Sequence, residues 1–370
     1  MKKTPNPIRI GFVGVGQIAK AHLKRYEGIP GAQVVAAADL NAEELARVAA
    51  LHSIPDTYSD FREMLKREDI DAVDVCLHNN LHAPVTIASL KAGKHVYCEK
   101  PMAGALKDAE NMLKAAQKTG RKLSIQLSTV FSQESKAARR LIADGHLGRI
   151  YHSKSSGWRR RGRPFVDGYG TESFVKKEIA AGGALYDMGV YHISQILDLL
   201  GAPEIARISG KIYQETSMDE KRRKSSGYNV EELGLGLVRF ANGTTMEVIE
   251  AWAAHLNPFE GSYLLGSEGG IRLDPFSYFN TTGDMPMNAS FDLGSADSRW
   301  HSLNPMETAY DSPQHHWIAA LQGLVPLLPT AEIALKTMLI SEGIYLSDRL
   351  GREVTAAEVS KASVSTAIKL

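Results

Sequence analysis

Short apolar segments alternate with segments of helical apolar spacing over the first third of the chain. Segments of the first kind are typical of buried strands, and segments of the second kind are typical of amphipathic helices. We expect strands at residues 8–13, 33–38, 72–77, 95–98 and 122–127. We expect helices at residues 18–26, 42–51, 84–92 and 106–118. This alternation predicts an α/β domain with a doubly wound parallel sheet of the Rossmann type, and we assign residues 1–127 to it.

After Gly148 the apolar segments become longer and alternate with polar residues. Such alternation predicts strands with one buried face, here at residues 150–158, 206–214, 234–240, 244–254 and 262–266. Asn242-Gly243 lies between two of these strands and is a hairpin signal. Helical patterns cover residues 181–200, 314–323 and 331–350. We therefore expect an α+β domain with an open, mostly antiparallel sheet at residues 128–370.

Two parts of this second domain carry no clear pattern. Residues 274–311 are rich in Ser, Asn, Pro and Met, and we expect them to form a long loop. The segment from Val354 onward is small and polar, and we assign it no element.

The composition is that of an ordinary globular protein, with 44% hydrophobic and 23% charged residues. The 43 basic and 42 acidic side chains nearly cancel, which argues against nucleic acid as the main partner. No apolar run approaches the roughly 18 residues that a membrane span needs, and no apolar signal core follows the N-terminus. Two cysteines, Cys76 and Cys98, are too few for a disulfide framework or a zinc cluster. We therefore expect a cytoplasmic protein without a metal site.

A glycine-rich turn follows the first expected strand. Gly14, Gly16 and Ala19 form the pattern G-x-G-x-x-A, which also fits any tight strand-to-helix turn when it is taken alone. Here an acid, Asp39, ends the next strand at the distance typical of dinucleotide-binding domains. The pyrophosphate would lie on the helix N-terminus, and Asp39 would bind the ribose hydroxyls and repel a 2′-phosphate. Because Leu40 follows rather than an arginine, the pattern predicts NAD rather than NADP.

Lys100 follows the strand at residues 95–98, at the sheet edge where ligands of open α/β sheets bind. Pro101 disfavours a helical conformation for the lysine before it, which leaves Lys100 in an extended turn. Taken alone, this position is more often that of a surface lysine at an ordinary strand-to-helix turn.

The segment 180–192 combines glycines with three groups that can carry protons. Asp187 and Tyr191 are spaced i, i+4 and share a helix face, and His192 lies one residue further round. An acid, a phenol and an imidazole within two turns can handle protons. The alternative is a core helix whose polar side chains are merely hydrogen-bonded.

Together these motifs resemble the glucose-fructose oxidoreductase / inositol dehydrogenase / MocA (Gfo/Idh/MocA) family. The resemblance extends from residue 8 to about residue 354 and includes 79–84 (NNLHAP) and 342–347 (EGIYLS). It implies a Rossmann domain and a C-terminal domain whose sheet often mediates homodimers or homotetramers. It also implies hydride exchange between NAD(P) and a carbon of a sugar, inositol or related polyol.

The resemblance implies a role for each residue of the proton-handling set. Lys100 would hydrogen-bond the reacting hydroxyl and stabilise the developing alkoxide, and Asp187 would orient the substrate. Tyr191 stands where many members have histidine. A phenol needs a pKa about three units lower to act as a base near pH 7, whereas the imidazole of His192 does not. We favour Tyr191 because a shift of one helical residue turns a side chain about 100° away.

Further cofactor contacts follow from the resemblance alone. The expected residues lie at the start of the first helix, beyond the fourth strand, and at the ends of the fifth and sixth strands: Gln17, Ile18, Leu77, His78, Asn79, His82, Glu99 and Gln126.

The stretch 145–166 contains no acidic residue and six basic ones. In the family, the end of this strand faces the substrate, so Trp158, Arg159 and Arg160 are candidate substrate-binding residues. An arginine beside an indole can bind an anionic sugar such as a uronate, phosphate or sulfonate. A solvated or subunit-interface strand fits the same residues.

Three functions fit these motifs. The first is an NAD-dependent oxidoreductase that acts on a hydroxyl carbon of a sugar, glycoside or polyol. The second is a glycosidase that holds and recycles NAD through oxidation, elimination, hydration and reduction. The third is an NAD-binding regulator without activity, which the intact Lys100 and Asp187 positions disfavour.

Overall fold

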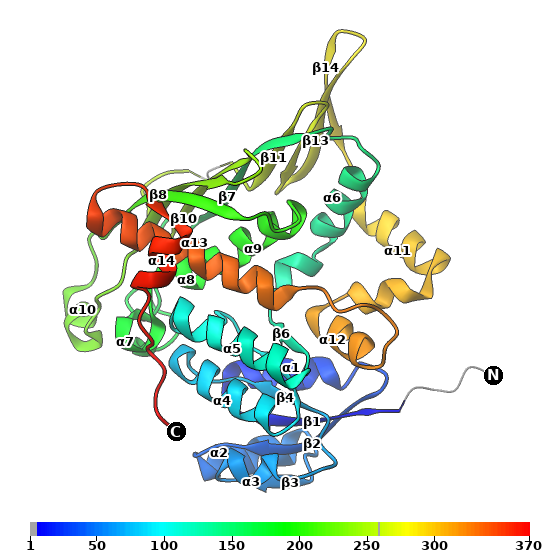
Figure 1. The fold of residues 1–370 in the computed structure, drawn as a ribbon, viewed down its shortest axis with the longest axis vertical. Coiled ribbons are helices and arrows are strands. Elements are labelled where there is room, and N and C mark those ends of the chain that lie inside the picture. Colours follow the sequence, from blue (N-terminus) through cyan, green and yellow to red (C-terminus); the bar gives the residue numbers. More distant parts are fainter. Residues whose placement is uncertain (1–5, 258–259) are drawn as a thin grey trace.

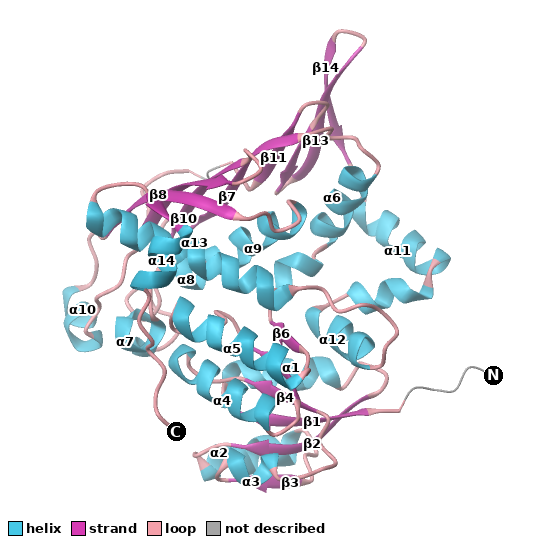
Figure 2. Cartoon of the chain, in the orientation of Figure 1, coloured by secondary structure: helices cyan, strands magenta, loops and turns pink. Residues whose placement is uncertain are grey.

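The computed structural model describes residues 6–257 and 260–370. It contains two sheets, each with helices packed against it. The N-terminal sheet lies at the end opposite the hairpin of β13 (Phe276–Thr282) and β14 (Met285–Ser290) (Figures 1 and 2). No helix in the described ranges is both long enough and apolar enough to cross a membrane.

The N-terminal sheet is parallel, with the strand order β3-β2-β1-β4-β5-β6. Its strands are β1 (Ile8–Val13), β2 (Ala32–Ala38), β3 (Asp56–Tyr58), β4 (Ala72–Val75), β5 (His95–Cys98) and β6 (Leu123–Ile125). The connecting helices are α1 (Gln17–Tyr26), α2 (Ala42–Leu51), α3 (Phe61–Leu65), α4 (Asn79–Lys91) and α5 (Leu106–Thr119). The strand order is the Rossmann order, so the predicted doubly wound sheet is confirmed.

Two differences from the sequence analysis concern this sheet. We assigned no residues to β3, which has only three residues and no buried one. Helix α4 begins at Asn79 rather than at residue 84, and Pro84 lies inside it. The apolar spacing becomes clear only after Pro84, whereas the helix starts in the polar residues that follow β4.

The C-terminal sheet has nine strands in the order β14-β13-β12-β11-β7-β10-β9-β8-β15. They are β7 (Ile150–Trp158), β8 (Ile205–Tyr213), β9 (Leu233–Phe240), β10 (Thr245–Ala251), β11 (Tyr263–Gly266), β12 (Gly270–Leu273), β13 (Phe276–Thr282), β14 (Met285–Ser290) and β15 (Val354–Thr355). Only the β7–β10 pair is parallel, which confirms an open, mostly antiparallel sheet. The hairpin signal is also confirmed, because Gly243 turns the chain between β9 and β10 with φ +86°.

Helices cover the inner face of this sheet, and α9 and α13 pack directly on it (Figure 1). The helices of this part are α6 (Gln133–Ala143), α7 (Lys177–Ala180), α8 (Ala184–Asp187), α9 (Gly189–Leu199), α10 (Glu220–Ser226), α11 (Leu293–Leu303), α12 (Pro313–Leu321), α13 (Thr330–Leu350) and α14 (Ala356–Ala362). No helix of the described chain covers the outer face (Figure 2).

The expected long loop at residues 274–311 is wrong, because this stretch contains β13, β14, α11 and a 3-10 helix (Pro305–Tyr310). The two strands bury only Tyr278 and α11 buries none of its residues, so neither shows the apolar pattern of a core element. The expected helix at 181–200 begins only at Ala184 and is interrupted at Met188. Ala181 has φ +70°, a conformation that a helix cannot contain.

Candidate active site

The turn between β1 and α1 has the geometry of a pyrophosphate-binding site. Gly14 has φ +89°, and a Cβ there would lie 2.3 Å from the carbonyl oxygen of Cys76. A Cβ on Gly16, by contrast, would meet no atom within 4 Å, so this backbone faces open space. No side chain caps the N-terminus of α1, which leaves its N–H groups free for an anion. The turn therefore fits a dinucleotide.

Asp39 stands at the end of β2 beside this turn. Its Oδ2 accepts a hydrogen bond from the Val15 N–H at 2.9 Å, and its Oδ1 accepts one from the Asn41 N–H at 2.8 Å. These bonds fix the carboxylate on the wall of a cavity of about 330 Å³, the β1–β2 pocket. The pocket is lined by Val13, Gly14, Ala38, Asp39, Leu40, Ser59, Asp60, Phe61, Arg62, Leu77, Leu81, Val85 and Leu370.

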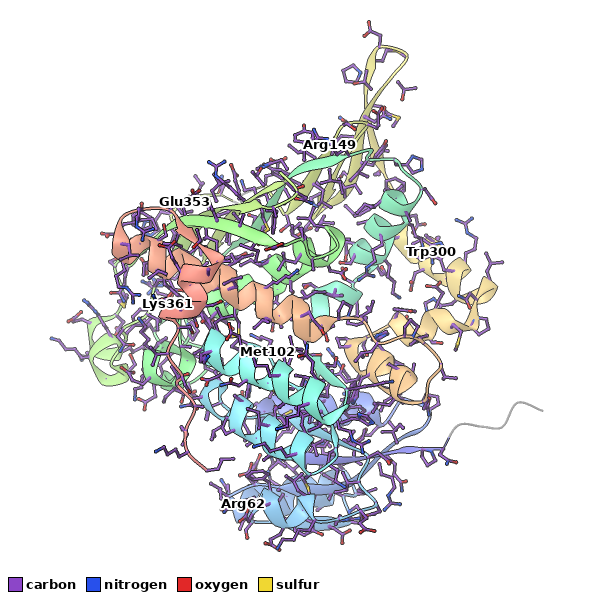
Figure 3. All side chains as sticks on the ribbon, viewed as in Figure 1. Arg62, Met102, Arg149, Trp300, Glu353 and Lys361 are labelled. Carbon is purple, nitrogen blue, oxygen red and sulfur yellow. The ribbon has the colours of Figure 1, made fainter. Side chains whose placement is uncertain are left out.

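The sequence analysis missed Arg62 as a pocket residue. It lies in α3 at the outer end of the Rossmann domain (Figure 3), and its guanidinium binds Asp60 at 2.7 Å. Because β3 and α3 bring it to the pocket from a later part of the chain, inspection of the residues after Asp39 could not reveal it.

Lys100 lies between Asp187 and Tyr191. Its Nζ is 3.1 Å from Asp187 Oδ1 and 4.5 Å from the centre of the Tyr191 ring, while Trp252 Nε1 donates to Asp187 Oδ2 at 3.1 Å. Burial would raise the pKa of the Asp187 carboxyl, but the Lys100 ammonium holds it below its usual value. Burial would likewise lower the pKa of Lys100, but Asp187 and Tyr191 raise it. The three side chains form one charged, hydrogen-bonded group.

Glu231, another residue that the sequence analysis missed, holds the N-terminus of α8. Its carboxylate accepts from the N–H groups of Gly183 at 2.8 Å and Leu185 at 3.0 Å. A Cβ on Gly183 would lie 1.9 Å from the Glu231 carbonyl oxygen, so only glycine permits this approach. Gly183 thus permits the contact that positions α8, whose last residue is Asp187.

A second cavity of about 220 Å³, the Lys100 cavity, connects these groups with the start of α1 and α4. It is lined by Ile18, Leu77, His78, Asn79, Glu99, Lys100, Ser173, Phe174, Ile179, Ala180 and Tyr191. Seven of the expected site residues therefore share one cavity, and Gln17 lies exposed at its α1 side. Asn79 Nδ2 also donates to the Ala180 carbonyl at 2.8 Å.

His192 lies away from Lys100. Its Nδ1 is 3.0 Å from Glu250 Oε2, and a Cβ on Gly157 would lie 2.3 Å from its ring. Ser155 Oγ donates to the other oxygen of Glu250 at 3.0 Å. Burial would lower the pKa of His192, but Glu250 raises it. Tyr191 and His192 are adjacent in α9 but contact different partners: Tyr191 lies against Lys100, and His192 pairs with Glu250.

Two further expected cofactor residues point into the protein. His82 is fully buried, with its ring nitrogens 2.8 Å from the Pro101 carbonyl and 3.0 Å from the Leu77 carbonyl. Gln126 is hydrogen-bonded to the hydroxyl of Tyr97. Both positions support the loops that form the cavity.

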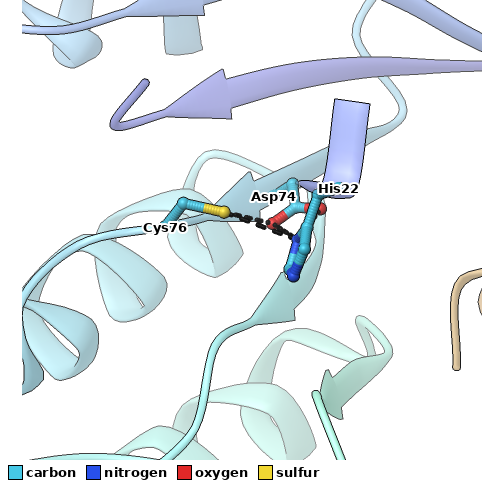
Figure 4. Close-up of side chains that lie close together, drawn as sticks. All are labelled: His22, Asp74 and Cys76. Carbon is cyan, nitrogen blue, oxygen red and sulfur yellow. Dashed lines mark hydrogen bonds and ion pairs between the residues drawn. The ribbon is translucent and has the colours of Figure 1, made fainter. Parts of the chain in front are cut away.

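Glu99 belongs to a buried polar cluster under the site. Its Oε2 accepts from the Lys100 backbone N–H at 2.8 Å, and its Oε1 lies 2.9 Å from His22 Nε2. The other His22 nitrogen is 3.0 Å from Asp74, which accepts from the Cys76 thiol at 3.2 Å (Figure 4). Burial would lower the pKa of His22, but Cys76 and Asp74 raise it well above its usual value. The sequence analysis missed His22 and Asp74, although an acidic residue inside the apolar strand β4 could have indicated a buried polar cluster.

The basic stretch at 145–166 is dispersed by the fold. Arg159 donates to the Gly162 carbonyl at 3.2 Å and lies close enough to Asp187 to lower its pKa, after the larger influences of burial and Lys100. Arg160 lies over the Trp158 ring at 5.9 Å and donates to Asn257 Oδ1 at 2.7 Å. Arg163 is fully buried.

Acidic residues from other segments neutralise part of this stretch. Asp167 and Glu232 each lie 2.9 Å from the Arg163 guanidinium. Glu247 approaches Lys154 at 4.0 Å. The stretch 145–166 contains no acidic residue, but in the folded protein acidic residues from other segments lie beside its basic side chains.

Comparison with known proteins identifies the class. Residues 8–127 match the oxidoreductase family with an NAD-binding Rossmann fold, GFO_IDH_MocA, and residues 135–272 match the GFO/IDH/MocA C-terminal domain. The two matches cover well over half of the chain, which belongs to the Gfo/Idh/MocA oxidoreductase family. Its N-terminal part is an NAD-binding Rossmann domain, and the chain is an oxidoreductase.

Two related proteins and one solved structure show how similar known proteins are to this chain. D-Glucoside 3-dehydrogenase of Escherichia coli K12 is 28% identical over 366 residues, which cover 95% of this chain and 98% of that protein. Inositol 2-dehydrogenase of Klebsiella pneumoniae (strain 342) is 31% identical over 144 residues, covering 38% of this chain and 43% of that protein. The structure of levoglucosan dehydrogenase with NADH and levoglucosan superposes with a TM-score of 0.78 at 21% identity, over 95% of this chain and all of that one, which shows the shared fold.

Proposed function

We propose that this protein is an NAD-dependent oxidoreductase that transfers hydride to or from a hydroxyl carbon of a sugar, glycoside or polyol. The observation that carries the proposal is the Lys100–Asp187–Tyr191 group, which borders the Lys100 cavity next to the glycine turn. The near full-length similarity to a D-glucoside 3-dehydrogenase supports a glycoside as substrate. Arg159 near Asp187 supports an anionic group on it.

Each residue of this group has one task in the proposed mechanism. Lys100 donates a hydrogen bond to the reacting hydroxyl and stabilises the negative charge that develops on its oxygen. Tyr191 would accept the hydroxyl proton as its phenolate, which the adjacent Lys100 ammonium would stabilise, and would thereby become the neutral phenol. Asp187, held by Trp252, orients the substrate and Lys100. Bound NAD supplies the hydride acceptor.

For the cofactor we propose NAD rather than NADP. Asp39 would accept hydrogen bonds from the ribose hydroxyls, and its charge would repel a 2′-phosphate. Gly16, Gln17 and Ile18 would contact the pyrophosphate, and Leu77, His78 and Asn79 would line the path to the nicotinamide. We assign His82, Glu99 and Gln126 to the support of this path, which revises their expected role as direct contacts.

A second candidate is the NAD-dependent glycosidase. Its elimination step removes a C–H proton next to the oxidised carbon, so it needs a proton-transfer group besides Tyr191. The His192–Glu250 pair, next to Tyr191 in the chain, is the observation that favours this candidate.

One experiment separates the two functions. Purified protein is incubated with a panel of sugars, glycosides and polyols, neutral and anionic, and NADH absorbance is followed while bound cofactor is quantified after denaturation. Net NADH formation with NAD added supports the dehydrogenase. Glycoside cleavage without net NADH, by protein that retains NAD, supports the glycosidase, and no turnover with any compound contradicts both.

We also propose that the protein is a cytoplasmic homodimer or homotetramer. Both cysteines are free and buried, which fits a reducing compartment. The outer face of the nine-stranded sheet presents the half-buried apolar residues Leu235, Leu237 and Ile249, which a second copy would cover.

A further inference from the structure

The segment 363–370 crosses from the C-terminal part of the chain onto the Rossmann domain. It leaves α14 just after Lys361 (Figure 3) and continues without helix or strand past α5 toward α4 (Figure 1, red). Ser363 Oγ accepts from the Lys107 N–H at 3.1 Å, where α5 begins.

Asp108 anchors the middle of this segment. Its side chain is 3% exposed; Oδ2 accepts from the Thr366 N–H at 2.9 Å, and the Ser365 hydroxyl donates to Oδ1. A Cβ on Gly104 would lie 2.4 Å from Thr366 Oγ1, so the segment sits directly on the backbone there. A buried carboxylate satisfied by the segment indicates a fixed position for it.

A hydrogen bond that is missing inside helix α4 is replaced by one from Ile368. Pro84 has no N–H, so the carbonyl of Asn80, four residues earlier, lacks its helical partner. The Ile368 N–H donates to this carbonyl at 3.2 Å. The helix therefore offers one free acceptor at the place where the segment passes, and the segment uses it.

Leu370 then reaches the β1–β2 pocket, where Gly14 and Asp39 also lie. Its side chain is 53% exposed, and Leu40 in the same pocket is 92% exposed. These two exposed leucines provide apolar faces for a flat ring such as adenine in a pocket that also holds the polar residues Asp39 and Arg62. A bound adenosine would bury both.

We propose that the segment 363–370 places Leu370 in the cofactor site, where it covers the adenosine half of bound NAD, and that Asp108 holds the segment in place. The cofactor leaves only when the end of the segment moves aside, so the segment slows its release. This inference rests on the NAD site and is independent of the sugar specificity.

The test measures NADH release from the full chain without any sugar, by stopped-flow fluorescence with excess NAD as competitor. Leu370→Ala leaves the Asp108 anchor intact, and we expect it to speed release about tenfold, as for the loss of one buried leucine contact. A chain that ends at Thr366 should release NADH at least as fast as L370A. The matched control is Val364→Ala, which changes an exposed residue of the same segment (77% exposed) and should leave the rate unchanged.

Two results would overturn the proposal. Release within twofold of the unaltered protein in both L370A and the shortened chain would show that the segment does not cover the cofactor. Tighter NADH binding in the shortened chain would show that Leu370 obstructs the pocket. Absence of NADH binding by the unaltered protein would instead contradict the proposed cofactor.

Discussion

At the scale of single residues, Lys100 has the most demanding position, because it faces a carboxylate and a phenol in a largely buried site. We expect Lys100→Ala to lower kcat by at least about 10³-fold, since the developing negative charge loses its nearest stabilising group. The affinity for NAD, measured by NADH fluorescence, should stay within a few-fold. Lys114→Ala, an exposed lysine on α5, is the control, and comparable activity in both variants would contradict the assignment.

Asp39 and Arg62 carry opposite charges on one pocket wall. We expect Asp39→Ala to weaken NAD binding about tenfold, because charge-assisted hydrogen bonds to the ribose are lost. Discrimination against NADP should also fall, since Arg62 remains to meet a 2′-phosphate. The measurement is the ratio of kcat/KM for NAD and NADP. An unchanged ratio would count against the ribose role of Asp39.

His22 lies between two buried carboxylates, Asp74 and Glu99. Its pKa is raised in the folded protein, so its charged form contributes stability that is fully present below the unfolded pKa of about 6.5. This contribution disappears as the pH rises through the folded pKa. We expect His22→Gln to lower the free energy of unfolding by about 3–5 kcal/mol at pH 6, and by less at alkaline pH. Urea unfolding at both pH values tests this, and a pH-independent difference would contradict it.

At the scale of elements, the turns that contain Gly16 and Gly183 differ in the atoms that an added Cβ would contact. We expect Gly183→Ala to destabilise the protein by about 1–3 kcal/mol and to reduce activity, because the added Cβ displaces Glu231 from the start of α8. Gly16→Ala should leave the unfolding free energy unchanged but weaken NADH binding, because its Cβ enters only the open space at the α1 turn. Equal stability of both variants would contradict this distinction.

Elements with a buried apolar pattern could be predicted from the sequence, and exposed ones could not. The strands β1 and β5 have the expected bounds, because each buries apolar side chains in a core. Helix α11 and the β13–β14 hairpin lack such a face, so composition alone suggested a loop.

The candidate site shows the same limit. Lys100, Asp187 and Tyr191 belong to motifs and could be found, whereas Glu231 and Arg62 come from segments that only the fold brings near. Contacts between distant segments depend on the packing of whole elements. The spacing of residues along the sequence therefore does not indicate these contacts.

At the scale of the whole molecule, the outer sheet face predicts the assembly. We expect light scattering to give the mass of a dimer or tetramer. Leu237→Arg should lower this mass, because a charge would be buried without a partner. Leu303→Arg, at a residue 78% exposed on α11, is the control and should leave the mass unchanged. A monomer before substitution would contradict the proposed assembly.

The return of the chain to the Rossmann domain has a consequence for its modularity. Trp317 of α12 packs in the same core as Phe12, and its ring centre lies 5.9 Å from that of Tyr97. Thr330, at the start of α13, lies 2.9 Å from Ser124 on β6. The nucleotide-binding half is therefore completed by residues encoded far downstream. A chimera that exchanges this half with a relative must also exchange α12 and the start of α13. Otherwise the packing against β1 and β5 would be lost.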